Sequence, residues 1–570
     1  MADVNDTNRC RDAIYSEEVA DYIVENLANI SNLENSQNFI CTQGITGKFD
    51  MVYIPITEPI TTQIITNAYR NLPKLYGLMD TASLEDMGVY RLRRLPYLEL
   101  YGTGTLIGVI DTGIDYTNPL FINTDNTSRI AAIWDQTVRE GPAPSDLSYG
   151  TEYLKADLNR ALASETPLEV VPSIDEDGHG TYISAIIGGN IDEKNDFSGV
   201  APRAEFVVVK LKPAKQYLRE FYKVSDGPIA YQDNDIMLGV EYLRRKALEL
   251  GRPISICLGL GTSSGDHDGD SNISNYLNSI SNQTGVCIST AAGNEGNTGH
   301  HNSGNVDIGA YKDIELKAGD KQKGLTLELW SITPTFFSVA LISPSGEIAE
   351  RVPARQGIDA EVTFVLEPTT IHVTYALSDT ATGNELIFIQ FDNLSPGIWK
   401  IRVYNDSNIG TRYDMWLPIS QFVDTDTFFL EPDPFTTLVE TGTTARVLSV
   451  GAYDNKGNSI YIASSRGYTL SNQIKPDLAA PGVNIFGPVS KIAFGEKSGS
   501  SIAAANAAGI GSLFLQWGIV EKKRPVMNTS EIKSLLISGA DRRAREYPNQ
   551  EWGYGALNAY NAFEGARKSI

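Results

Sequence analysis

Residues 498–504 read Ser-Gly-Ser-Ser-Ile-Ala-Ala, which places a serine among small residues at the expected start of a helix. Two earlier stretches also set a polar residue beside glycine. Residues 109–113 read Val-Ile-Asp-Thr-Gly, and residues 177–181 read Asp-Gly-His-Gly-Thr. The chain therefore carries an acid, a histidine and a serine in that order, each close to a glycine that permits a tight turn.

These polar residues, Asp111, His179 and Ser501, fit acyl transfer through a serine ester. A serine hydroxyl is a poor nucleophile until a neighbouring imidazole removes its proton. The imidazole needs an acid on its other nitrogen, which fixes the tautomer and stabilises the imidazolium. The order acid, histidine, serine differs from the orders of chymotrypsin-type proteases and of α/β-hydrolases. Ser501 also lies in Gly-x-Ser-x-Ala rather than Gly-x-Ser-x-Gly, which argues against an esterase.

A fourth candidate follows an apolar run, in residues 290–296, Thr-Ala-Ala-Gly-Asn-Glu-Gly. Acyl transfer needs hydrogen-bond donors aimed at the developing oxyanion, and an asparagine amide can serve as one. We expect Asn294 to supply that side-chain donor and the backbone amide of Ser501 to supply the second.

The pattern around these motifs predicts an α/β fold with a parallel sheet covered by helices on both faces. Continuous apolar runs alternate with helical stretches, which is typical of parallel βαβ units. Function in such sheets lies outside the carboxyl ends of the strands, where Asp111 and Asn294 both fall. The apolar runs are residues 106–110, 205–210, 253–258 and 286–290, and the helical stretches are residues 235–248 and 271–282.

Residues 303–432 carry a different pattern, with short strand-like runs, several of period two, separated by turn signals. This predicts an inserted all-β domain, a sandwich or jelly roll. The α/β pattern resumes at residues 445–452, so we assign the catalytic domain to residues 81–302 and 433–570. The insert also accounts for the long separation between Asn294 and Ser501.

Residues 1–80 form a separate α+β module in this interpretation. A helix is expected from Ser16, with an acidic first turn and one apolar face. Residues 51–56 predict a strand, and residues 61–72 predict a second helix. The apolar face of the first helix would consist of Val19, Ile23, Leu27 and Ile30.

Composition excludes several classes of function. The 570 residues are 42% hydrophobic and 21% charged, as in ordinary globular proteins of more than one domain. The formal net charge of −23 argues against binding nucleic acid or an anionic membrane. The N-terminus has neither the basic nor the apolar region of a secretory signal, and no run is long enough to cross a membrane. We therefore expect synthesis in the cytoplasm and no membrane insertion.

The four cysteines, Cys10, Cys41, Cys257 and Cys287, are widely spaced and form no Cys-x-x-Cys pair. We interpret all four as free core thiols, with no zinc site and no disulfide framework. No string resembles an EF-hand, so the sequence indicates no cofactor and no metal, although structural calcium stays open. His300 and His301 are adjacent, and their rings would diverge on a strand rather than share a metal.

The motifs resemble those of the subtilisin-like (S8) serine proteases over about residues 83–300 and 440–565. Residues 499–509 align without gaps to that family's serine motif, although Asn506 and Tyr182 stand where members usually carry histidine. The resemblance implies catalysis by Asp111, His179 and Ser501. It also implies that substrate pairs as an extra strand with Leu258 and Gly259, while Ala291, Ala292 and Gly293 wall a roomy pocket with Glu295 near its rim.

Within that family the chain is most similar to the clostridial Csp germination proteases, because it combines a short upstream module with a jelly-roll insert. Residues 1–80, upstream of a subtilisin-like core, resemble a pro-domain, and with the intact triad they predict self-cleavage between Pro73 and Ser83. The Csp resemblance implies a spore-associated endopeptidase that activates a cortex-lytic enzyme precursor, with protein substrates and its own pro-domain as partners. The alternative is a pseudoprotease that acts by binding.

Overall fold

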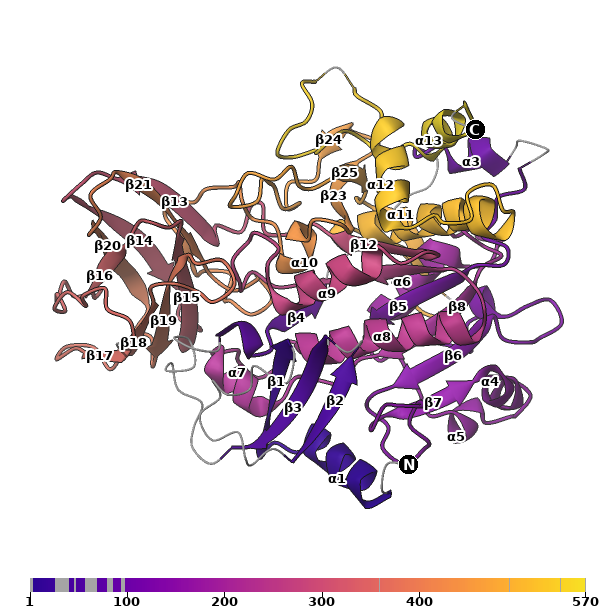
Figure 1. The fold of residues 1–570 in the computed structure, drawn as a ribbon, viewed down its shortest axis with the longest axis horizontal. Helices are drawn as coiled ribbons and strands as arrows, with labels where there is room; N and C mark the ends of the chain where they lie inside the picture. The colour runs from indigo at the N-terminus through magenta and orange to yellow at the C-terminus, as the bar shows by residue number, and fades with distance from the viewer. Residues whose placement is uncertain are drawn as a thin grey trace.

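The structure is a computed structural model that describes residues 4–25, 40–45, 48–56, 69–78, 86–93, 98–357, 359–491, 493–543 and 545–568. It consists of an α/β body, a β-insert on one side and a small N-terminal module below the body (Figure 1). The central sheet has the strand order β24-β23-β12-β10-β5-β8-β6-β7, with β25 also paired to β23. The two edge strands β24 and β7 run antiparallel, and the other pairings are parallel.

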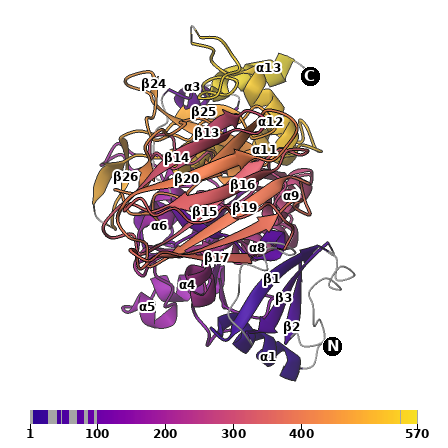
Figure 2. The ribbon, with the colours of Figure 1, turned by 90° about the vertical axis from the view of Figure 1, so that its left-hand side faces the viewer.

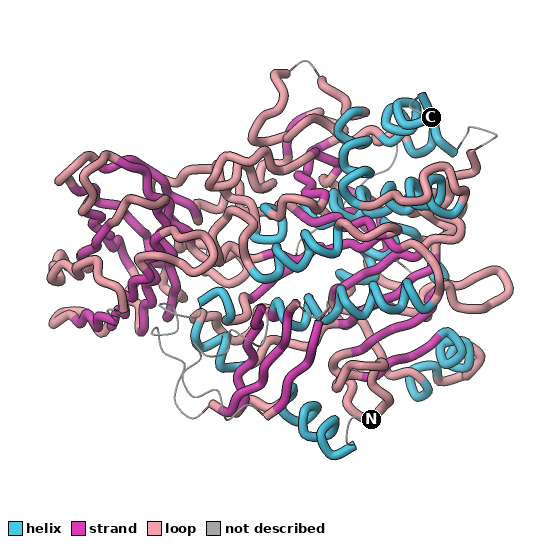
Figure 3. Tube along the Cα trace, viewed as in Figure 1, coloured by secondary structure: helices cyan, strands magenta, loops and turns pink. Residues whose placement is uncertain are grey.

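Four inner strands of the central sheet, β5, β8, β10 and β12, form where the sequence has the predicted apolar runs. Each inner strand is buried along most of its length, because helices cover both faces (Figure 3). The strands are β5 (Leu106–Asp111), β6 (Ile130–Asp135), β7 (Thr151–Leu154), β8 (Glu205–Lys210), β10 (Ile254–Leu258), β12 (Val286–Ala291), β23 (Leu448–Asp454), β24 (Ser459–Ile460) and β25 (Leu478–Pro481).

The covering helices divide the apolar core into two layers. On one face α6 (His179–Gly188) and α11 (Ser500–Leu515) pack against side chains such as Val109 and Cys257. On the other face α8 (Asp233–Glu249) and α9 (Asn272–Ser281) pack against alternate side chains such as Ile110 and Ile256. Neighbouring residues of one strand thus belong to different layers. The helices expected at residues 235–248 and 271–282 are confirmed with slightly shifted ends.

The remaining elements of the body are shorter or lie at its edges. One helix within the described residues, Ser500–Val520, is long and apolar enough to span a membrane, but 94% of its apolar 18-residue window is buried inside the protein as core. The other elements are α3 (Val89–Arg93), η3 (Pro119–Phe121), α4 (Lys155–Leu162), α5 (Pro167–Val170), α7 (Gln216–Phe221), α10 (Glu440–Thr443), β26 (Ile485–Pro488), β27 (Phe494–Lys497), η4 (Gln516–Val520), α12 (Thr529–Ser538) and α13 (Ala559–Lys568).

The β-insert (β13 to β22, His301–Phe429) consists of two antiparallel sheets that enclose their own apolar core (Figure 2). Its first strand, β13, pairs with a late strand, β21. The two segments that connect the insert to the body therefore lie next to each other. The six-stranded sheet contains β13 (His301–Val306), β21 (Thr411–Trp416), β15 (Gly324–Ser331), β19 (Glu385–Asp392), β18 (Thr370–Ala376) and β17 (Asp359–Thr363), and the four-stranded sheet contains β16 (Phe337–Ile342), β20 (Gly397–Asn405), β14 (Tyr311–Ala318) and β22 (Phe428–Phe429).

The N-terminal module (residues 4–78) differs from the sequence prediction at its first element. The helix expected from Ser16 is wrong: α1 covers Val4–Tyr15, and β1 covers Val19–Glu25. β1 pairs along its length with the predicted strand, β3 (Phe49–Pro55), and both of its faces are largely buried. Tertiary pairing of β-branched residues thus overrides the helical spacing.

Two other parts of the module bear on the sequence prediction. Strand β2 (Cys41–Ile45) completes its three-stranded sheet on the other side of β3. The second predicted helix, residues 61–72, lies largely outside the described residues, and its described end forms the short turn η2 (Tyr69–Asn71).

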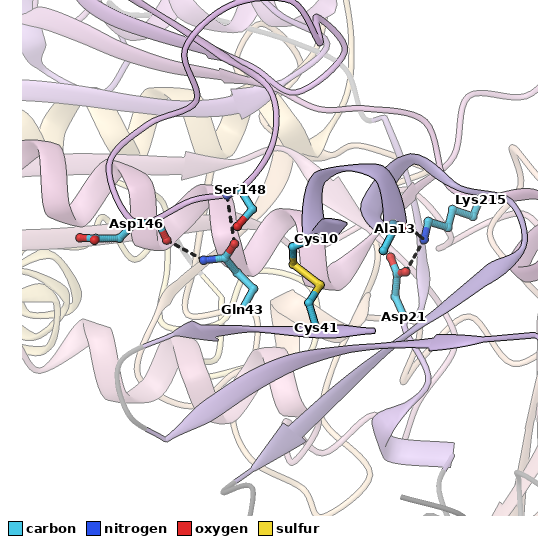
Figure 4. Close-up of a disulfide and its surroundings, with 8 residues drawn as sticks. All are labelled: Cys10, Ala13, Asp21, Cys41, Gln43, Asp146, Ser148 and Lys215. Carbon is cyan, nitrogen blue, oxygen red and sulfur yellow. Dashed lines mark hydrogen bonds and ion pairs between the residues drawn. A yellow bond between two sulfur atoms is a disulfide. The ribbon is translucent and has the colours of Figure 1, made fainter. Parts of the chain in front are cut away.

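The expectation of four free thiols is also wrong in part. Cys10 of α1 and Cys41 of β2 form a disulfide that closes the module (Figure 4). The sequence gives no sign of this pairing, because the partners meet only when α1 packs on the sheet. Cys257 and Cys287 are free and buried in β10 and β12, as expected.

Buried polar contacts fasten the N-terminal module to the catalytic body. Asp21 is fully buried, and its carboxylate forms an ion pair with Lys215, 2.5 Å from Oδ1 to Nζ. Nζ of Lys215 also donates to the carbonyl oxygen of Ala13, 3.1 Å away. A second contact uses the Gln43 amide, which donates to the Asp146 carbonyl at 2.6 Å and accepts from the Ser148 backbone amide at 3.1 Å (Figure 4).

Replacing both Cys10 and Cys41 by serine should destabilise the N-terminal module. The disulfide closes a loop with a sequence separation of 31. A cross-link over such a loop contributes about 3–4 kcal/mol by restricting the unfolded chain. We expect a reducing agent to lower the melting temperature of the wild-type chain and to leave the melting temperature of the double serine variant unchanged. An equal effect on both chains would contradict a stabilising disulfide.

Candidate active site

The first two predicted catalytic residues meet between the end of a strand and the start of a helix. Asp111 is the last residue of β5, and His179 is the first residue of α6. Oδ1 of Asp111 lies 2.7 Å from Nδ1 of His179, with both side chains almost fully buried. With Asp111 ionised, Nδ1 carries the ring proton, and Nε2 is left as the acceptor.

Ser501 completes the group from the first turn of α11. Its Oγ lies 3.3 Å from Nε2 of His179, slightly longer than a strong hydrogen bond. Such distances are common before substrate binds. The residue is fully buried. The structure thus brings together an acid, a base and a nucleophile that are separated by up to 390 positions in the sequence.

Glycines permit the close approach of these elements. A β-carbon on Gly180 would lie 2.2 Å from the carbonyl oxygen of Gly113, so no other residue fits at the second position of α6. A β-carbon on Gly259 would lie 3.1 Å from Cβ of Ser501 and 3.6 Å from Cε1 of His179. Gly259 therefore borders the space where a reacting peptide must sit.

Asp175 holds the start of α6 in place, a role that sequence reasoning missed. Its Oδ1 accepts from Oγ1 of Thr112 at 2.6 Å and from the Gly178 amide at 3.0 Å. Its Oδ2 accepts from the backbone amide of Thr181 at 2.8 Å. One carboxylate thus ties the residue after Asp111 to both sides of His179. The position lies in the connection between α5 and α6, and its acidic character was the available signal.

Asn294 lies against the start of α11. Its Oδ1 accepts the backbone N–H of Ser500 at 3.0 Å, which fixes the orientation of the side-chain amide. Within the described chain, no acceptor takes a hydrogen bond from its Nδ2, so both N–H groups stay available to a ligand. The Gly293 amide donates to Oγ of Ser500 at 3.2 Å and so adds a second tie between the two segments. This orientation is compatible with the predicted donor role of Asn294.

The residues predicted to wall the specificity pocket lie beside Asn294. Ala291 ends β12, and Ala292 pairs through its backbone with Val450 and Val439. Gly293 has a φ of +117°, and a β-carbon there would lie 2.5 Å from Oγ of Ser465. All three are small and buried, and Ser465 packs directly against Gly293, so the roomy pocket expected at these residues stays a prediction.

Glu295, expected near the pocket rim, is 4% exposed and turns its carboxylate toward the β-insert. It accepts from His300 Nδ1 at 3.1 Å and from the backbone amide of Ser420 at 3.0 Å. Although burial raises the pKa of Glu295, these hydrogen bonds and the charge of His300 lower it below its ordinary value. His301 pairs separately with Asp414, so the two adjacent histidines do diverge.

A segment of the N-terminal module lies beside the triad between strands β9 (Tyr231–Gln232) and β11 (Leu260–Gly261), and we call the place between these two strands the groove. This segment, strand β4 (Leu75–Leu78), forms a three-stranded antiparallel sheet with them. The strand that receives β4 begins two residues after Leu258. Leu258 itself belongs to the central sheet, where it pairs with Ile110 and Thr290.

Tyr182, which stands where the resembled family usually has histidine, supports the far side of α6. Its hydroxyl donates to the carbonyl oxygen of Ile485 in β26. A β-carbon on Gly487 would lie 2.6 Å from its ring, so the ring packs directly on that strand.

Among the described residues, no group of three or more His, Cys, Asp or Glu side chains lies close enough together to hold a metal ion.

The fold and the triad together define a serine protease of the subtilisin type. Comparison with known proteins agrees, since the Subtilase family model matches residues 102–349 and 431–555. The chain therefore belongs to the subtilase family.

Three relatives illustrate the range of similarity. The solved structure of the Clostridium perfringens CspB protease superposes with a TM-score of 0.75 at 30% identity, over 84% of this chain and 96% of that one. Serine protease AprX of Bacillus subtilis is 34% identical over 149 residues, 23% of this chain and 32% of AprX. C5a peptidase of Streptococcus pyogenes is 22% identical over 501 residues, 81% of this chain and 39% of that protein. The chain thus spans well under half the length of the last two.

Replacing Asn294 by alanine should lower kcat by about 10²–10³-fold, because the oxyanion would lose a donor. KM should change little, since the donor acts mainly in the transition state. Steady-state kinetics on a peptide substrate checks this, with Asn297→Ala as the control, an exposed asparagine three residues away. A variant with full kcat would exclude Asn294 from the oxyanion site.

Replacing Asp175 by alanine should lower kcat by about 10²-fold through displacement of His179. The matched control is Glu176→Gln, whose carboxylate is 71% exposed and pairs with Lys210 at 2.8 Å. The kcat of this control should stay within about twofold of the wild-type value, because exposed ion pairs contribute little. A purely structural role would lower the melting temperature while leaving kcat per folded molecule unchanged, and that result would refute the positioning role.

Proposed function

We propose that this protein is a subtilisin-type endopeptidase that matures by cutting its own chain just after β4. The observation that carries the proposal is the antiparallel pairing of β4 with β11 directly beside Ser501. Strand addition of this kind is how many proteins bind extended peptides. The segment before the predicted cut is therefore bound in the manner expected of a substrate.

The strand register supports a particular scissile bond. Leu78 is paired with Leu260 and Gly77 with Gly261, so the next residue of a peptide in this register is opposite Gly259. Because Gly259 borders Ser501, the carbonyl of that next residue is the expected point of attack. In this sequence it is Met79, which lies outside the described residues. The expected new N-terminus is Asp80, within the range predicted from the sequence.

The reaction follows from the roles of the triad. His179 Nε2 removes the proton of Ser501 as Oγ attacks the carbonyl carbon, and Asp111 stabilises the resulting imidazolium. Asn294 and the Ser501 backbone amide bind the oxyanion. The imidazolium then protonates the departing amine, leaving an acyl-enzyme that water hydrolyses.

We further propose that the mature enzyme activates a protein precursor by limited cleavage in spores. Support comes from the resemblance of the chain to Csp germination proteases, among them the structural relative from Clostridium perfringens. Its physiological substrate would be the precursor of a cortex-lytic enzyme. Incubating the purified protein with that precursor should yield one shorter product, and Ser501→Ala should yield none. An uncut precursor would refute this assignment without affecting self-cleavage.

A second candidate function is binding without catalysis, because β4 fills the groove and Ser501 is fully buried. In that case the triad would be intact but covered. A fluorophosphonate probe distinguishes the two functions, since it labels only an accessible, activated serine. Labelling of Ser501 after displacement of the segment in mild denaturant would exclude a silent triad.

The Ser501→Ala variant should remain at full length on a gel, while the wild-type chain becomes shorter by the N-terminal module. Loss of the nucleophile removes the acyl-enzyme route altogether. N-terminal sequencing of the wild-type product should begin at Asp80. Ser534→Ala, which alters an exposed serine of α12, is the control and should still be processed. Processing of Ser501→Ala at the wild-type rate would refute self-cleavage.

A further inference from the structure

Lys74, the residue just before β4, is buried inside the protein with an exposed fraction of 4%. Lysine is rarely buried to this extent. Its backbone continues the pairing of β4, because the Asp233 amide donates to the Lys74 carbonyl at 3.2 Å. Its Nζ donates to the carbonyl oxygen of Leu72 at 3.0 Å. The groove thus holds the side chain of Lys74 as well as its backbone.

Acidic side chains lie near this lysine, since Asp233 and Asp379 line the same small cavity as Lys74. Burial lowers the pKa of Lys74, and the carboxylates of Asp233, Glu328, Asp379 and Glu440 counteract that effect. Asp233 is the strongest of these and begins α8, directly after the groove strand β9. Glu328 and Asp379 come from the β-insert, so two domains contribute charge to one place.

Some oxygens of these carboxylates lack a hydrogen-bond donor. Oδ1 of Asp233 and Oε2 of Glu440 are buried and accept no hydrogen bond from the described residues. Burial raises the pKa of Asp233 to about 7, while Lys74 acts to lower it, and burial likewise raises the pKa of Glu440 to about 7. Buried carboxylates of this kind are stabilised by a nearby cation and destabilised without one.

A cavity of about 20 Å³ adjoins the lysine. It is large enough for about one water molecule, or for the extra atoms of an arginine. The site would therefore accept either basic side chain. Residues that line the cavity include Lys74, Asp233, Asp266, Asn272, Trp330 and Asp379.

We propose that Asp233 and Glu440 form an acidic subsite that selects substrates with lysine or arginine at the position of Lys74. This position is four residues before the one that pairs with Leu260. The inference rests on the proposed function, because it assigns a substrate class to the same groove. Backbone pairing provides affinity that is independent of sequence, and the acidic subsite provides selectivity.

The physical basis is the cost of leaving a buried charge without its partner. A neutral side chain in the subsite would leave Asp233 and Glu440 without the cation that stabilises them. Removing the cation that faces a buried carboxylate weakens binding substantially. We expect at least a tenfold preference for lysine over glutamine.

Hydrogen exchange in the Ser501→Ala chain tests the subsite without any need for catalysis. Lys74→Gln should speed exchange of the amides of residues 75–78 about tenfold, while Lys74→Arg should retain protection. Asp233→Asn should remove most of the difference in exchange rate between the chain with Lys74 and the Lys74→Gln variant. The matched control is Asp270→Asn, an exposed acid on the same loop as Asp266. Equal exchange rates in the chain with Lys74 and in the Lys74→Gln variant would overturn the proposal.

Cleavage of peptides that span residues 70–85 tests the substrate class directly. The wild-type enzyme should cleave the peptide with Lys at position 74 at least tenfold faster, in kcat/KM, than the peptide with Gln. Asp233→Asn should bring the ratio close to one, and Asp270→Asn should preserve it. A ratio near one in the wild type would refute the subsite. If neither peptide were cut, the proposed peptidase function would fail, and hydrogen exchange would still decide whether the subsite exists.

Discussion

The close approach of β5 and α6 is the constraint on which the active site depends. The 2.7 Å contact between Asp111 and His179 requires the first turn of a helix to touch the turn after a strand. That contact leaves no space for a β-carbon at Gly180. The carboxylate of Asp175 then holds the two segments together from the side. The remaining site residues are brought to this point by parallel neighbours of β5 and by α11.

Much of the fold and of the candidate site could be predicted from the sequence because the relevant signals are local. The burial of β5, β8, β10 and β12 can be predicted from the apolar composition of each strand alone. The turns at Asp111, His179 and Ser501 carry their glycines next to the functional residue. The β-insert was visible as a change of period from 3.6 to 2. Apart from the β-insert, each of these features depends on fewer than twenty consecutive residues.

The rest could not be predicted because it depends on contacts between distant parts of the chain. The spacing of Val19 and Ile23 fits a helix face, but pairing with β3 makes this segment a strand. The partners of the disulfide approach each other only in the folded module. The position of β4 between β9 and β11 depends on segments more than 150 residues away. A single sequence shows the composition of such segments but not which of them come into contact in the fold.

The placement of β4 has a consequence for competition at the groove. While it is covalently attached, this strand faces the triad at an effective concentration on the order of millimolar, so a free substrate at lower concentration is excluded. In the proposed maturation, cutting the chain after β4 would not release the strand at once, because the ion pair of Asp21 with Lys215 and the contacts of Gln43 would still fasten its module to the body. The rate at which that module dissociates, rather than the rate of bond cleavage, would then determine when the enzyme becomes available to other proteins.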